Sequence, residues 1–124
     1  MIAEDVLAIA REVRHEYEQI ANEESFPESL CGLCARASMT LFNRLREAGV
    51  KRIGLAYCLN HVYVTVGKMA LDITATQFRV EYKAVHFVPL SQWREPVRRF
   101  RSADALRDYM LYHGWPHEQI MEQS

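Results

Sequence analysis

The stretch His61-Val-Tyr-Val-Thr-Val-Gly-Lys-Met-Ala-Leu-Asp-Ile-Thr74 decides the fold of this chain. Two runs of alternating side chains flank Gly67, and a glycine at the first central position suits a two-residue type II′ turn. We therefore predict a β-hairpin in which Val66 pairs with Met69. Strand residues point alternately to opposite faces of such a hairpin.

The alternation fixes which residues share a face. In the predicted register His61 and Asp72 are diagonal neighbours, whose Cα atoms lie about 7–8 Å apart, so an imidazole–carboxylate hydrogen bond is within reach. A slip of one residue would mix apolar and polar side chains on both faces, so the pattern determines the register. The apolar face carries Val62, Val64, Val66, Met69, Leu71 and Ile73, and the other face carries His61, Tyr63, Thr65, Ala70, Asp72 and Thr74.

A segment with two cysteines, Cys31-Gly-Leu-Cys34-Ala-Arg-Ala-Ser38, opens a second predicted helix of about residues 30–48. Ser29 is the expected N-cap of this helix and Gly49 the expected C′ residue. A helix N-terminus and a neighbouring imidazolium both lower the pKa of a cysteine from about 8.5. The chain therefore contains a thiol, an imidazole and a carboxylate, which are the parts of a thiol enzyme.

The rest of the chain predicts helices near both ends and further strands beside the hairpin. Helices kept apart from a mostly antiparallel sheet define the α+β class. We expect one α+β domain, residues 1–124, with the central helix packed on an antiparallel sheet. Its other elements are expected as helices at 4–21 and 103–112 and strands at 53–57 and 85–88, with Ser102 capping the last helix and Pro89 at a sheet edge.

The composition is that of an ordinary globular protein: 124 residues, 49% apolar and 25% charged, with a net charge of −1. This charge gives no push toward nucleic acid or membrane, and the N-terminus carries acids where a secretory signal carries basic residues. Three cysteines argue against a disulfide framework. We expect a cytoplasmic protein with no membrane or nucleic-acid partner. A basic run at 94–101 is read as a solvated face, with an anionic substrate or RNA contact as the alternative.

The cysteine segment resembles the nucleophile region of papain-like proteases, in which Cys-Gly-x-Cys opens the central helix and the second cysteine attacks. The short order of cysteine, histidine and aspartate is similar to transglutaminase-like members of the papain-like superfamily. The strand that begins at His61, and the run Leu71-Asp-Ile-Thr-Ala-Thr-Gln-Phe78, resemble the histidine and aspartate strands of small bacterial and phage transglutaminase-like proteins.

This resemblance implies a papain-like or transglutaminase-like core and acyl transfer through a thioester. Cys34 would attack the carbonyl of a peptide or protein amide, His61 would move the proton, and Asp72 would orient His61. No cofactor is required. Tyr63 and Gln77 are the expected substrate-binding residues.

One position departs from the papain-like pattern. Papain-like proteases have a glutamine six residues before the nucleophile as an oxyanion donor, and Glu28 stands at that position here. An ionised carboxylate cannot donate a hydrogen bond. The backbone N–H of Cys34 is a candidate donor, and Gln77 and Asn60 are further candidates.

Two other functions fit the same residues. Cys31, Cys34, Cys58 and His61 have zinc-knuckle spacing and could hold tetrahedral zinc in an interaction module. A helical position of the first two cysteines weighs against this set, because zinc knuckles lie in tight turns. The third reading is a catalytically inactive papain-like binding protein. The sequence does not identify the substrate, the acyl acceptor or the oligomeric state.

Overall fold

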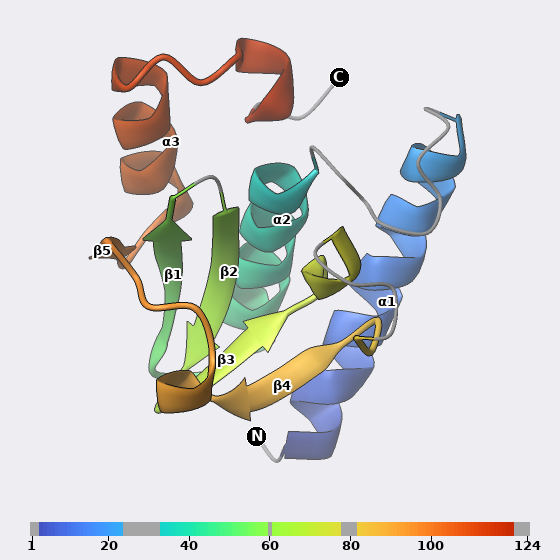
Figure 1. Ribbon diagram of the computed structural model, residues 1–124. Coiled ribbons are helices and arrows are strands. Elements are labelled where there is room, and N and C mark those ends of the chain that lie inside the picture. Colours follow the sequence, from blue (N-terminus) through green and yellow to red (C-terminus); the bar gives the residue numbers. More distant parts are fainter. Residues whose placement is uncertain (1–2, 24–32, 60, 78–81, 121–124) are drawn as a thin grey trace.

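The structure is a computed structural model that describes residues 3–23, 33–59, 61–77 and 82–120. These residues form an α+β fold, which confirms the predicted class. Strands β4, β3, β2, β1 and β5 follow one another in this order across one antiparallel sheet (Figure 1). The helices are α1 (Ala3–Glu23), α2 (Cys34–Glu47) and α3 (Ala103–Tyr112), the strands are β1 (Ile53–Cys58), β2 (His61–Val66), β3 (Met69–Asp72), β4 (His86–Pro89) and β5 (Arg98–Phe100), and short 3₁₀ helices are η1 (Ala75–Gln77), η2 (Leu90–Gln92) and η3 (His117–Gln119).

The central hairpin has the predicted register. Val66 pairs with Met69, and the pairing continues to Val64 opposite Leu71. Gly67 has φ +58°, whereas the φ of Lys68 is not positive. A type I′ turn needs a positive φ at both central residues, so this turn is of type II′. The predicted division of the hairpin into an apolar and a polar face therefore holds.

Helix α2 covers the apolar face of the hairpin. Its side chains Leu41 and Leu45 join Val62 and Val64 in the main core, and α1 packs beside α2 (Figure 1). The hydroxyl of Ser38 donates to the carbonyl of Val62 at 3.0 Å, which ties the start of α2 to the start of β2. This contact places the N-terminus of the helix beside the first residues of the hairpin.

Helix α2 begins later than the sequence predicts. The first intrahelical bond runs from the Ala37 N–H to the Leu33 carbonyl at 2.9 Å, so Leu33 is the N-cap and Cys34 the first helical residue. The expected N-cap Ser29 lies outside the described residues. Gly32 gives a reason for the later start, because a glycine inside a helix costs about 1 kcal/mol relative to alanine. The other end is as predicted, with Gly49 at φ +86° after the helix.

The segment that links β4 to β5 crosses the second face of the sheet. These two strands are the opposite edges of the sheet, so residues 90–97 must span its width. Leu90 and Trp93 pack on a small cluster that includes Ala56, Tyr63 and Ala70. The polar face of the hairpin is therefore covered and does not meet water. The sequence pattern did not predict β5, whose residues belong to the basic run.

The start of α3 is as predicted. Ser102 caps α3, and its Oγ accepts a hydrogen bond from the Ala105 N–H at 3.2 Å.

Among the residues that the structure describes, no helix combines the length and the apolar character that a membrane crossing needs.

Candidate functional site

His61 and Asp72 lie together on the polar face of the hairpin, as the register predicts. The Nε2 atom of His61 is 2.6 Å from Oδ2 of Asp72. Both side chains are 0% exposed. A hydrogen bond in which one partner is charged is about twice as strong as a neutral one, and it is screened little when water is excluded. The pair therefore fixes the orientation of the imidazole ring.

Asp72 is itself held by three more donors. The backbone N–H and the hydroxyl of Thr74 donate to Oδ1 at 2.9 Å and 3.2 Å. The indole Nε1–H of Trp93 donates to Oδ2 at 3.0 Å. These hydrogen bonds engage both oxygens of the buried carboxyl group. The arrangement therefore fixes the carboxyl group of Asp72 beside the histidine.

Cys34 lies on the other side of the imidazole. It is the first residue of α2, and its side chain is 4% exposed. Its thiol forms a side-chain hydrogen bond with His61. The structure thus brings the three predicted residues into one chain of hydrogen bonds.

The surroundings change the proton affinity of His61. Burial lowers the pKa of this histidine, but the hydrogen bonds to Asp72 and Cys34 and the negative charges of these partners outweigh burial and raise it from 6.5 to about 9. At neutral pH the ring is therefore charged.

A buried arginine fixes the turn that follows Asp72. Nη1 of Arg14, in α1, donates to the Ile73 carbonyl and to the Thr76 hydroxyl, both at 2.9 Å. Arg14 is 4% exposed and also pairs with Glu18 at 3.5 Å. This contact anchors the loop behind the site to the helical layer.

The two expected substrate-binding residues have different positions. Tyr63 is 0% exposed, and its hydroxyl donates to the Arg94 carbonyl. A fully buried phenol cannot contact a substrate. Tyr63 instead holds residues 90–97, the segment that covers this face of the sheet. Gln77 is the last residue of η1, and its side chain lies outside the described residues. Glu28 and Asn60 also lie outside them.

The structure describes three of the four residues of the zinc set. Cys58 opposes His61 in the β1–β2 pairing, and its Sγ donates to the Arg94 carbonyl at 3.8 Å. Burial raises the pKa of the Cys58 thiol to about 11, which disfavours the thiolate that zinc requires. Cys31 lies outside the described residues. Within the described ranges, no group of three or more His, Cys, Asp or Glu side chains is placed to hold a metal ion.

Sequence reasoning missed three residues that support the site. Thr74 had a local signal, because an Asp side chain commonly accepts hydrogen bonds from the backbone two residues on. Trp93 and Arg14 had none, because only the folded chain brings them to Asp72 and to its loop. No protein-family model, curated protein or solved structure matches this chain.

Proposed function

We propose that this protein is a cysteine-dependent amide hydrolase or acyltransferase built on a papain-like or transglutaminase-like core. One observation supports this most: a buried imidazole bonded through Nε2 to Asp72 and hydrogen-bonded to the Cys34 thiol. Nucleophile, base and orienting carboxylate then act in the order that covalent catalysis on an amide requires. The antiparallel sheet with α2 across the hairpin is compatible with such a core.

In the proposed reaction, the Cys34 sulfur donates an electron pair to the amide carbonyl carbon, and the carbonyl electrons move to oxygen. His61 holds the proton from the thiol. When the tetrahedral intermediate collapses, the C–N bond breaks and His61 gives its proton to the leaving amine. Water or a second amine then attacks the thioester and loses a proton to His61, and the C–S bond breaks to restore the thiolate.

The start of α2 supports the negative charges in this reaction. The first N–H groups of a helix have no intrahelical acceptor, and they carry the positive end of the helix dipole. Leu33, the N-cap, provides no side-chain acceptor for the N–H groups of this first turn. The backbone N–H of Cys34 is the oxyanion donor that we propose, which would replace the glutamine missing at position 28.

Alkylation of the thiols tests the proposal. Iodoacetamide is small enough to probe a side chain that is 4% exposed, and peptide mass spectrometry assigns the modification to each cysteine. A Cys31→Ser background leaves two thiols. At pH 6.5 we expect Cys34 to react at least tenfold faster than Cys58, because Cys58 stays protonated with a pKa of about 11.

The His61→Ala variant separates an enzyme from a binding protein. Without the imidazolium, the alkylation of Cys34 at pH 6.5 should slow, whereas the rate of Cys58, which its own burial sets, should not change. A His61→Ala protein that folds and still shows rapid alkylation of Cys34 would contradict the proposed role of His61. Equal, slow reaction of both thiols in the unmodified chain would instead support an inactive relative that binds without catalysis.

A further inference from the structure

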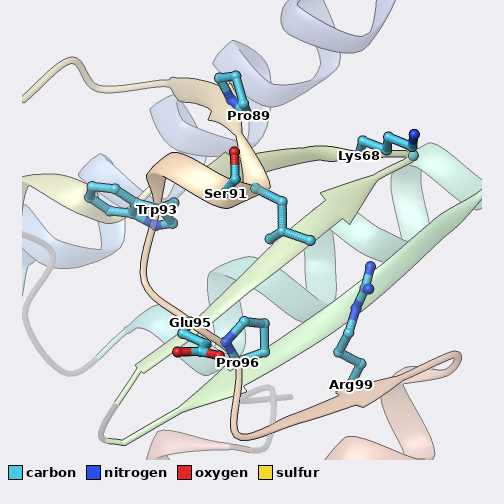
Figure 2. Close-up of a pocket in the computed structure, with 9 residues that line it drawn as sticks. Lys68, Pro89, Ser91, Trp93, Glu95, Pro96 and Arg99 are labelled. Atoms are coloured by element: carbon cyan, nitrogen blue, oxygen red, sulfur yellow. The ribbon is translucent and has the colours of Figure 1, made fainter.

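The sheet face opposite α1 and α2 carries two adjoining pockets. The first, of about 750 Å³, lies between the turn at Lys68, the segment after β4, and Arg99 of β5 (Figure 2). The second, of about 360 Å³, also includes Arg99 and continues along β1 to Arg52. Gly54 lines this second pocket, where an added Cβ would lie 3.0 Å from Oγ1 of Thr65, so larger side chains would fill it. The two pockets meet at Arg99, and we call them together the basic groove.

The groove is cationic in a chain that is nearly neutral. Arg52, Lys68, Arg99 and Arg101 line it and are exposed, and Glu95 is the acidic residue in the two linings. Within the described part of the chain, none of these four cations forms an ion pair. The net charge of the whole sequence is −1. This face therefore carries more positive charge than the net charge of the chain would suggest.

The groove shares one residue, Trp93, with the surroundings of Asp72. Trp93 lines the first pocket and donates its indole N–H to Asp72. Lys68 precedes β3 and lies four residues before Asp72. With about 3.3 Å per strand residue, this separation corresponds to about 13 Å along the sheet. About four residues of an extended peptide would span the separation between Lys68 and Asp72.

We propose that this basic groove, defined by Arg52, Lys68, Arg99 and Arg101, binds an acidic segment of the peptide or protein substrate. That this acidic segment belongs to a substrate rests on the proposed function, whereas the binding of an acidic peptide to the groove does not. Guanidinium groups pair with carboxylates through two parallel hydrogen bonds, and three of the four cations are arginines. Charge complementarity along an extended groove favours a peptide with several acidic residues.

The linings favour a peptide over RNA. Proteins that bind single strands stack successive bases on exposed aromatic rings. In the described linings the aromatic residues are Trp93 and Phe100; the first is engaged by Asp72 and the second is buried. The first pocket is otherwise lined by Pro89, Leu90 and Pro96 among its apolar residues. The rings of Trp93 and Phe100 therefore do not form a series of exposed surfaces on which successive bases could stack.

Fluorescence anisotropy with defined probes tests the proposal on the full chain. The probes are fluorescein-labelled hexaglutamate, hexaglutamine and hexauridine RNA at low salt. We expect saturable binding of hexaglutamate, no comparable binding of hexaglutamine, and weaker binding of the RNA. Lys68→Glu and Arg99→Glu should each weaken hexaglutamate binding about fivefold. Arg11→Glu, an exposed charge reversal on α1 in the opposite layer, is the matched control and should leave it unchanged.

The outcomes separate the groove from the enzyme. Tighter binding of hexauridine than of hexaglutamate, or an equal loss in Arg11→Glu, would overturn the groove proposal, as would the absence of saturable hexaglutamate binding. Circular dichroism establishes that the variants, all at exposed positions, remain folded. Alkylation of Cys34 is measured on the same samples. An unreactive Cys34 thiol with intact hexaglutamate binding would contradict only the proposed function. A reactive Cys34 thiol without hexaglutamate binding would contradict only the groove proposal.

Discussion

Replacing Asp72 by asparagine should remove most of the pH dependence of stability that His61 creates. The pKa of His61 is raised from 6.5 to about 9 in the folded chain, although burial alone would lower it. One pKa unit corresponds to 1.36 kcal/mol, so the shift represents an upper limit of about 3 kcal/mol of folding free energy. Because the folded pKa is the higher one, this stabilisation is fully present below pH 6.5 and is lost as the pH rises through 9.

The assay is urea unfolding at several pH values between 6 and 9.5. The unmodified chain should lose up to about 3 kcal/mol of unfolding free energy across this window. In Asp72→Asn the burial of His61 is no longer opposed by the carboxylate, so its pKa should fall toward or below 6.5 and the loss should shrink. His86 also lies beside Asp72, but burial lowers the pKa of His86, so its contribution to the pH dependence has the opposite sign and cannot cause this loss.

Asp104→Asn is the matched control. Asp104 pairs with Arg107 at 2.9 Å, but its side chain is 85% exposed, so we expect a change below about 1 kcal/mol and an unaltered pH profile. Titration of the His61 ring by NMR measures the same pKa directly. An Asp72→Asn chain with the pH profile of the unmodified protein, or an unmodified chain equally stable at pH 6.5 and 9, would refute the reasoning.

Three further substitutions test other contacts. Trp93→Phe keeps an aromatic ring but removes the 3.0 Å donor to Asp72, so we expect about 1.5–3 kcal/mol of destabilisation by urea unfolding and a slower alkylation of Cys34; unchanged values would mean that the indole only packs. Gly54→Ala places a Cβ 3.0 Å from Oγ1 of Thr65 and 3.1 Å from a carbonyl oxygen of β5, so thermal unfolding should show a loss of about 1–3 kcal/mol, and a fully stable variant would contradict this crowding. Ser102→Ala removes the N-cap of α3 and should cost about 1 kcal/mol, measured in the same way, whereas Ser102→Gly should cost only a few tenths.

The local pattern of the sequence determined the hairpin and the class of fold. Strict alternation on both sides of Gly67 leaves one register that keeps apolar residues together, and the structure has that register. Turn and cap residues such as Gly49 and Ser102 act within a few positions of the chain, so their roles are readable without the fold. For the same reason the approach of His61 to Asp72, within one hairpin, could be predicted.

Tertiary structure decided the rest of the site. The start of α2 at Cys34 brings the thiol to the imidazole, and this depends on how the helix packs across β2. The donor from Trp93 depends on a segment that crosses the sheet from one edge to the other. Such contacts join residues far apart in sequence, and long-range packing leaves no periodic signal in the chain. The basic run likewise became one side of a groove only when β5 paired with β1 and set Arg99 beside Lys68.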